Sequence, residues 1–517
     1  MKSLRAQILC GLLIAFATAG LTSCHSDIFL AYKFPEFTFA NRPVPPSLLA
    51  NRVMVGVSSG AGSGSLQILD ALRDLRTNIQ NTKTFSIAGY ASAFPSMILN
   101  FPAEITGYVY SSAKGDVQII NYGKEAVGTA AGTFPGSNGV AVPPTFAHLY
   151  AASESAGQLT VVDNVAGKTY GLNLPNVFQV VVNQGDSVVL AMVRNSNTIY
   201  RVIKLNDSQF QTSTAAIAAI GAADCEPFNI PIYCVVPVNS VNSASPGTST
   251  FDRPTNVYFS LDGNTAYVLN CGAECGGTMS SVTYLQPGAL QVNTYTINTP
   301  SNANAFIMQV PVPGGVTAAL SSGTTLYVSG QQLQPDGLFA GNLSTISLAT
   351  NTVTGQYSIS DGNHSKMLFA DDNTLWIGSQ FCATGERAAR AAKGITDQTA
   401  NYNCLSRFDM GALTASIVPF VTQGSATAVV PFPNTNQNQY YYGDLTGLCW
   451  VQGKHKVYTA YGGQVHAFYT GGTITDMNDP AVGTTPAAGS EINNVNIILQ
   501  GTALDVAYLD AVTDADN

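Results

Sequence analysis

The stretch LSSGTTLYVSGQQLQPDGLFAGNLSTISLATNTVTGQYSI, residues 320–359, decides how the rest of the chain is interpreted. A tight turn near its start is followed by segments in which apolar and polar residues alternate with the period of two that is typical of half-buried β-strands. The predicted strands are 326–328, 343–348 and 353–359, with a polar loop at 330–341 and a turn at 349–351. We therefore expect this stretch to form most of one small antiparallel sheet.

Relatives of this unit recur along the chain, and a repeat of this kind governs the fold. Copies of its first strand are found at 53–57, 108–111, 149–152, 188–193, 266–270, 326–329, 375–379 and 457–461. Turn dipeptides such as Asp262-Gly263 precede several copies, and another apolar strand such as 257–260 precedes the turn. Turn residues between two apolar runs predict hairpins. The unit is thus strand a, tight turn, strand b, longer loop, strand c, turn, strand d.

Four-stranded antiparallel units at intervals of roughly 40 residues or more are typical of the blades of an all-β propeller. The copy that begins at Val53 has no convincing strand a before it, whereas residues 503–508 near the C-terminus form an unpaired apolar strand. Pairing that C-terminal strand with the N-terminal blade would close the ring. The copies predict eight blades, with seven as the alternative because some copies are irregular.

Three segments, AYVLN at 266–270, LYVSG at 326–330 and ATNTV at 349–353, resemble the YVTN-type β-propeller repeat. About four copies match it well. The resemblance implies a propeller fold and an exported bacterial protein, and it implies no catalytic residues.

The composition narrows the classes of partner. Charged residues make up only 10% of the 517 residues, against roughly 25% in a typical soluble domain. The 48 Gly and 25 Pro are distributed along the chain, as many short turns require. The net charge of −9 argues against nucleic acid, whose phosphates need a clustered positive field.

The N-terminus predicts export. Lys2 and Arg5 precede an apolar run at 8–20, which is typical of a secretory signal peptide at 1–23. The run ends in LTSC, which resembles the bacterial lipobox, so Cys24 is the expected lipidation site. His25 follows in place of an Asp, which favours an outer-membrane lipoprotein, with its periplasmic or surface orientation open. Residues 24–50 are expected to be a Pro-rich and aromatic tether, and residues 51–517 the propeller.

Close spacing of cysteines predicts disulfides in an oxidising compartment. The expected pairs are Cys225–Cys234, Cys271–Cys275 and Cys382–Cys404, with Cys449 left free. A zinc site at Cys271 and Cys275 is the weaker alternative because no further ligands lie nearby in sequence.

Long insertions indicate which face of the ring binds partners. In a four-stranded blade the b–c loops and d–a connections emerge on one face, and the insertions at 210–253, 270–280 and 380–403 are assigned to it. Loops on a rigid scaffold are where function usually resides. The last insertion contains the charged residues Glu386, Arg387, Arg390 and Lys393, a candidate binding loop on a short helix or simply a solvated surface.

No motif for catalysis, a metal or a cofactor is found. We therefore expect a non-enzymatic, envelope-anchored propeller that binds a protein or glycan, with its lipid anchor in the membrane. Two alternatives stay open: an enzyme resembling lactonase-type propellers, which would need acidic, basic and His side chains at the central channel, and a structural surface-layer component.

Overall fold

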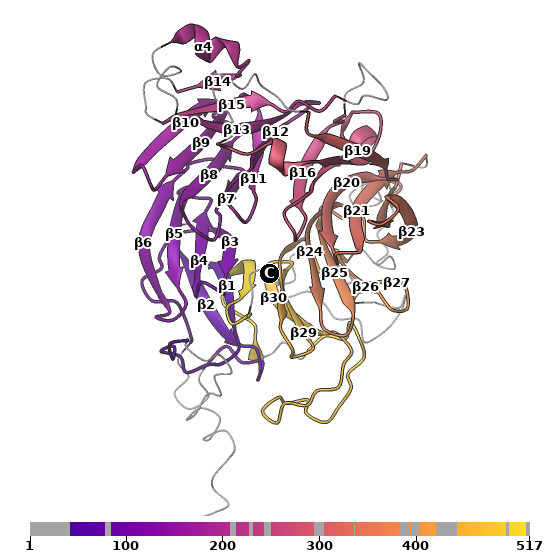
Figure 1. Cartoon of the computed structure of the whole chain (residues 1–517). Coiled ribbons are helices and arrows are strands. Elements are labelled where there is room, and N and C mark those ends of the chain that lie inside the picture. The colour runs from indigo at the N-terminus through magenta and orange to yellow at the C-terminus, as the bar shows by residue number, and fades with distance from the viewer. Residues whose placement is uncertain are drawn as a thin grey trace, which may run out of the picture.

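The computed structural model describes residues 42–60, 62–77, 84–206, 213–226, 231–241, 250–293, 304–335, 337–382, 392–394, 403–419, 442–492 and 496–512. Nearly all of its regular structure is β-strand, in eight antiparallel sheets. In Figure 1 the labels β6 to β3 on one side, and β27 to β24 on the other, run from the outside of the ring toward its middle. The all-β propeller is confirmed, and it has eight blades.

The blades are numbered from the one that closes the ring and are listed from the inside outward. Blade 1 contains β31 (Thr502–Tyr508), β1 (Arg52–Ser58) and β2 (Gly64–Asp70). Blade 2 contains β3 (Pro95–Phe101), β4 (Thr106–Ser111), β5 (Asp116–Asn121) and β6 (Ala126–Thr133). Blade 3 contains β7 (Gly139–Ala141), β8 (His148–Ser153), β9 (Gln158–Asp163) and β10 (Lys168–Asn173). Blade 4 contains β11 (Val177–Val182), β12 (Val189–Val193), β13 (Ile199–Leu205), β15 (Ile232–Pro237) and β14 (Asp224–Cys225), and α4 (Thr214–Ala219) precedes β14.

The second half of the ring consists of blades 5 to 8. Blade 5 contains β16 (Pro254–Phe259), β17 (Ala266–Asn270), β18 (Ser281–Leu285) and β19 (Phe306–Pro311), with the short 3₁₀ turns η1 (Gly272–Cys275) and η2 (Pro287–Ala289). Blade 6 contains β20 (Gly315–Ser321), β21 (Thr325–Leu333), β22 (Phe339–Ser347) and β23 (Thr352–Ile359). Blade 7 contains β24 (Asn363–Ala370), β25 (Thr374–Gln380), β26 (Leu405–Asp409) and β27 (Thr414–Val418). Blade 8 contains β28 (Leu445–Val451), β29 (Lys456–Tyr461) and β30 (Gln464–Tyr469).

Short segments complete the two three-stranded sheets. In blade 1 the Ile87 amide donates to the carbonyl of Leu66 at 2.9 Å, so the chain near residue 87 lies along β2 as a fourth strand. In blade 8 the Ile492 amide donates to the carbonyl of Ala467 at 2.8 Å, which places the chain near residue 492 along β30. All eight blades therefore contain the four strands a to d, as the repeat predicts, and blade 4 has β14 as a fifth, outer strand.

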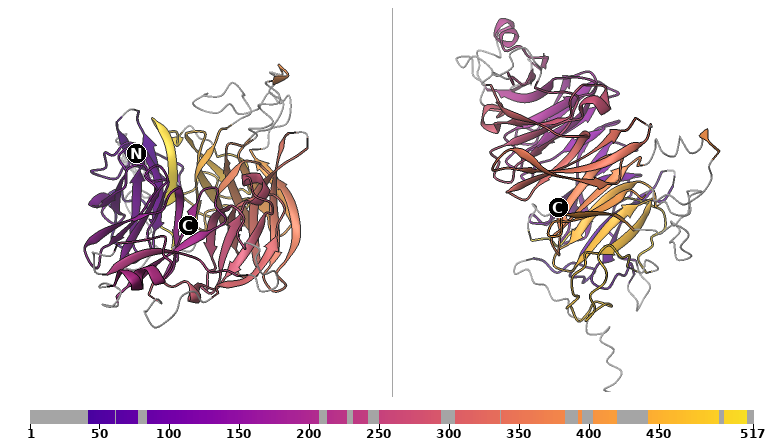
Figure 2. Two further views of the ribbon diagram at one scale, coloured as in Figure 1. Left: turned by 90° about the horizontal axis from the view of Figure 1, so that it is seen from above. Right: turned by 90° about the vertical axis from the view of Figure 1, so that its right-hand side faces the viewer.

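The ring closes as the sequence predicts. Strand β31 pairs antiparallel with β1, with Val55 opposite Val506, so the last strand of the chain is strand a of the first blade. Figures 1 and 2 show the yellow C-terminal strand beside the indigo N-terminal ones. Each strand b predicted from the repeat is also a second strand of its blade in the structure.

The core lies between the blades. Each of the eight junctions between neighbouring blades holds one cluster of buried apolar side chains, and the cluster between blades 3 and 4, for example, contains Leu159, Val180 and Val235. Burying a side chain of this size contributes about 1.5–3 kcal/mol. A ninth cluster, which includes Ile220 and Cys225, packs α4 and β14 onto the outer part of blade 4.

Seven of the eight inner strands contain a β-bulge near their first residues. The unpaired residues are Ser96, Phe178, Thr255, Thr317, Ser365, Thr446 and Leu504. Ser or Thr occupies five of these positions, and two of the hydroxyls join neighbouring blades: Thr255 Oγ1 donates to the carbonyl of Val316 at 2.9 Å, and Thr317 Oγ1 to that of His364 at 3.0 Å. Bulges re-aim side chains at the rims of closed sheets.

Two faces follow from this topology. We call the face with the b–c loops and d–a connections the loop face, and the face with the a–b and c–d turns the turn face. The loop predicted at 330–341 is shorter than expected, because β21 and β22 stay paired as far as Leu333 and Phe339. Among the described residues, no helix is both long enough and apolar enough to cross a membrane.

Residues 42–50, which the sequence assigns to the tether, pack on the ring. The Leu48 amide donates to the carbonyl of Pro45 at 3.0 Å, and Leu49 is buried in the cluster between blades 1 and 2. The predicted signal peptide, Cys24 and the remaining tether lie outside the described residues.

Candidate binding site on the loop face

Two disulfide-bounded insertions lie on the loop face. Cys271–Cys275 closes the start of the b–c loop of blade 5, and Cys382–Cys404 bounds the b–c loop of blade 7. Both pairs are the predicted ones, and Cys449 is the buried free cysteine. A cross-link lowers the conformational entropy that a loop can lose on binding, so the two disulfides favour these loops as binding elements.

The third predicted pair forms a disulfide, but on the other face. Cys225 in β14 is bonded to Cys234 in β15, which is strand d of blade 4 and pairs with strand c, β13. The insertion that contains α4 therefore connects strands c and d and emerges on the turn face, so the assignment of 210–253 as a whole to the loop face is wrong. Only the connection after β15 belongs there. The prediction failed because the apolar segment 232–237 was not identified as strand d.

A buried carboxylate shapes the b–c loop of blade 5. Asp252 Oδ2 accepts hydrogen bonds from the Thr278 amide at 2.7 Å, the Thr278 hydroxyl at 2.6 Å and the Met279 amide at 2.7 Å. Burial alone would raise the pKa of Asp252, but these donors and the Arg253 charge lower it below its ordinary value. Gly277 is required here because a Cβ at this position would overlap the Asp252 carboxylate.

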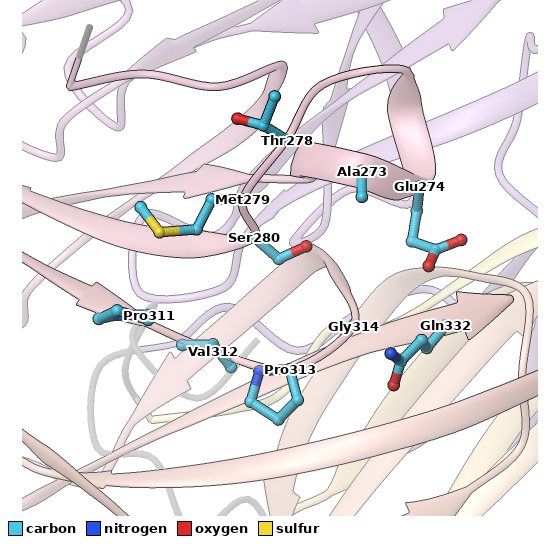
Figure 3. A pocket seen from close by; sticks show the side chains of 10 residues that line it. All are labelled: Ala273, Glu274, Thr278, Met279, Ser280, Pro311, Val312, Pro313, Gly314 and Gln332. Carbon is cyan, nitrogen blue, oxygen red and sulfur yellow. The ribbon is translucent and has the colours of Figure 1, made fainter. Parts of the chain in front are cut away.

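Beside this loop lies a hollow of about 360 Å³ between blades 5 and 6. It is lined by Ala273, Glu274, Thr278, Met279, Ser280, Pro311, Val312, Pro313, Gly314 and Gln332. Figure 3 shows Glu274 on the η1 turn and Gln332 on the strand that faces it, with Met279 and the proline-containing connection as the apolar walls. Three segments of the loop face thus meet in one site.

The polar groups that line the hollow differ in whether they already have a hydrogen-bond partner. The hydroxyl of Ser280 is engaged by the carbonyl of Cys271 and that of Thr278 by Asp252. Within the described part of the chain, neither the Glu274 carboxylate nor the Gln332 amide has a hydrogen-bond or ion-pair partner. An anionic group beside Met and Pro surfaces suits a ligand with a positive or hydrogen-donating group on an apolar stem.

The predicted charged loop can be assessed only in part. Lys393 is exposed, and Glu386, Arg387 and Arg390 lie outside the described residues. Sequence reasoning missed Asp252, Glu274 and Gln332. The first two come from the d–a connection and the b–c loop of blade 5, and Gln332 comes from β21 of blade 6, so the three are far apart in sequence.

The eight inner strands carry three acidic, basic or imidazole groups. Lys366 Nζ contacts Asp505 Oδ1 at 3.2 Å, and Asp505 is almost wholly buried with its other oxygen accepting from the Ile98 amide. Burial raises the pKa of Asp505 even though Lys366 opposes it. His364 is almost wholly buried, and its Nε2 lies 2.6 Å from the Ser360 carbonyl, so this nitrogen already has a partner within the protein. Of the acidic, basic and His side chains that a lactonase-type enzyme would need at the central channel, the inner strands thus supply one ion pair, Lys366–Asp505, and the buried His364.

The other described histidines and clustered carboxylates lie at contacts between loops and blades. The imidazole contacts are His148 Nδ1 to Asp186 at 2.5 Å, His455 Nδ1 to Asp372 at 2.9 Å and His466 Nδ1 to Glu491 at 2.6 Å. Lys456 is fully buried on the turn face and pairs with Asp74 at 2.8 Å and Asp479 at 2.7 Å, which joins blade 8 to blade 1. No group of three or more potential metal ligands occurs in the described residues.

Comparisons with known proteins complete this description. No family model matches the chain, and no curated protein matches it. Solved structures similar to it include the dihydro-heme d1 dehydrogenase NirN, with 11% identity, a TM-score of 0.47 and coverage of 92% of this chain and 79% of that one. A candidate 6-phosphogluconolactonase from Bacteroides uniformis has 11% identity, a TM-score of 0.40 and coverage of 72% and 97%. The Swd1 β-propeller domain from Myceliophteria thermophila has 9% identity, a TM-score of 0.41 and coverage of 73% and 98%. The propeller assignment itself rests on the strand pairing.

Proposed function

We propose that this chain is a binding protein of the bacterial envelope, held at the outer membrane through lipidated Cys24, which captures a partner with its loop face. The ligand we propose for the hollow is a protein segment that presents a Lys or Arg side chain. The observation that carries the proposal is the Glu274 carboxylate, which no described residue pairs with, in a hollow whose walls are fixed by a disulfide and by Asp252.

The chemistry of the hollow supports a basic segment. A Lys or Arg stem can pack on Met279 and Pro313 while its charged end reaches Glu274, because long cationic side chains have an apolar stem and a polar tip. The low charge of the whole chain leaves few competing cations on its own surface. A glycan that carries an amino sugar offers related chemistry and is distinguished by the experiment below.

Photocrosslinking from two positions of one blade tests the proposal. A photoreactive amino acid at Met279, on the loop face of blade 5, is compared with one at Leu261, in the a–b turn of the same blade on the turn face. In cells, we expect protein adducts from position 279 and few from position 261. Equal yields from both positions would contradict the proposal. Adducts that stain only for carbohydrate would show that the ligand is a glycan and not a protein segment.

A charge variant sharpens the same experiment. Glu274→Gln keeps the shape of the hollow but removes its negative charge, so we expect the adduct yield from position 279 to fall several-fold. Glu104→Gln, which removes an exposed carboxylate in the a–b turn of blade 2 on the turn face, is the matched control and should leave the yield unchanged. An unchanged yield in Glu274→Gln would show that the carboxylate does not select the partner.

A further inference from the structure

The chain enters the propeller on the turn face. Arg42, the first described residue, donates to the carbonyls of Pro102 at 2.6 Å and Ala511 at 2.9 Å. Pro102 lies in the a–b turn of blade 2, and Ala511 follows the end of β31. Any segment joined to the N-terminal side of Arg42 therefore starts on the turn face, opposite the hollow.

Residues 42–49, where the chain enters the ring, contact it at several points. Pro43 packs on Gly123, where a Cβ would lie 2.4 Å from the proline Cγ. The Ser47 amide and hydroxyl donate to the Glu125 carboxylate at 2.8 and 2.5 Å. Leu49 is buried among the side chains between blades 1 and 2. These contacts fix where the chain leaves the ring.

An ion network connects this attachment to the ring closure. Arg52 contacts Glu125 at 3.0 Å and Asp510 at 2.7 Å, and all three side chains are almost wholly buried. Charge-assisted contacts of this kind are specific in geometry, and removing one partner of a buried pair is strongly destabilising. The N-terminal segment, the C-terminal segment and blade 2 are thus held together at one place on the turn face.

We propose that the turn face is the side directed toward the lipid bilayer and that the loop face points away from it. The inference rests on the anchor of the proposed function. Residues 24–41 would span at most roughly 60 Å when fully extended, and the point of the ring to which they are joined is fixed on the turn face. If the loop face were turned to the bilayer, these residues would have to run around the edge of the ring and along its thickness, about 23 Å for the seven residues of β1. The turn face can approach the bilayer without that detour. The hollow at Glu274 is then presented to partners beyond the membrane surface.

Energy transfer to labelled lipids measures this orientation directly. The full-length lipidated protein is reconstituted into vesicles whose headgroups carry an acceptor dye, with a donor dye on a single cysteine introduced by Leu261→Cys or Met279→Cys. Cys449 is buried and the other described cysteines are in disulfides, so labelling is confined to the new thiol. We expect transfer from position 261 to exceed transfer from position 279 several-fold. Equal transfer, or more from position 279, would overturn the orientation.

The same vesicles separate failure of the orientation from failure of the anchor. Cys24→Ser should abolish both sedimentation with the vesicles and transfer from either position. If the unaltered protein also stays in the supernatant, the anchor is refuted and the orientation with it. If the protein sediments with the vesicles but both labels behave alike, only the orientation is refuted, and the photocrosslinking at position 279 still tests the loop face.

Discussion

Removing the Asp252 carboxylate should loosen the binding loop without unfolding the ring. In Asp252→Ala, the amides of Thr278 and Met279 and the Thr278 hydroxyl lose their shared acceptor. The residue lies in the connection before β16 and belongs to no strand, so the pairing of blade 5 stays intact.

The magnitude follows from these three hydrogen bonds. A hydrogen bond to a charged group contributes about 1.5–3 kcal/mol when it is shielded from water. Thr278 and Met279 are exposed, so water replaces part of each bond, and about 1 kcal/mol for each is the appropriate scale. The sum of about 3 kcal/mol corresponds to roughly a hundredfold change in a local opening equilibrium.

Hydrogen exchange at single residues tests this magnitude. We expect the amides of Thr278 and Met279 to exchange roughly a hundredfold faster in Asp252→Ala, and amides in the middle of β17 to keep their rates. Asp262→Ala, which alters a carboxylate in the a–b turn at the other end of the same blade, is the matched control. If the rates at Thr278 and Met279 do not change, Asp252 does not order the loop.

Three further predictions concern the ring and the site. Lys456→Met leaves Asp74 and Asp479 buried without their cation and should lower the free energy of unfolding by about 3–5 kcal/mol in guanidinium titrations; wild-type stability would show that this cluster does not hold blade 8 to blade 1. Burial lowers the pKa of His364 to about 4. Between about pH 6.5 and pH 4 this histidine is therefore protonated in the unfolded chain but neutral in the folded one, and the free energy of unfolding should fall by about 3 kcal/mol over that range as the pH is lowered. His364→Gln should flatten that part of the pH profile, and an identical slope in the variant would assign it to other groups. Replacing both cysteines of the 271–275 disulfide by Ser should cost about 2 kcal/mol or less in unfolding free energy, because the closed loop is short, yet reduce photocrosslinking at position 279 several-fold; an undiminished yield would show that the loop needs no cross-link.

The frame of the fold could be predicted because it is local and repeated. Alternation over a few residues followed by a turn identifies a strand pair, and the copy at 320–359 shows its blade almost in full. Closure could be predicted as well, since the unpaired strand at 503–508 matches the missing strand a of the first copy.

The site could be predicted only where chemistry is close in sequence. The half-cystines of each disulfide lie within one segment, so their spacing identified the pairs. The misplaced insertion before β15 shows the limit: once strand d was overlooked, the insertion between strands c and d was assigned to the loop face instead of the turn face. Asp252 meets the blade 5 loop through the folding of its own blade and Gln332 through the packing of blade 6 on blade 5, and nothing in their local sequence marks them.

The bulge hydroxyls of Thr255 and Thr317 make two successive junctions between blades alike. Thr255 and Thr317 perform the same task at successive junctions, each reaching a main-chain carbonyl of the next blade, so the contact depends little on which side chains the neighbour carries. A blade could therefore be duplicated or lost in evolution without a change in the side chains that form such a junction. The seam is different, because there Asp505 accepts from the Ile98 amide and pairs with Lys366. In evolutionary terms, we expect changes in blade number at junctions such as these two rather than at the one where Asp505 contacts its neighbours.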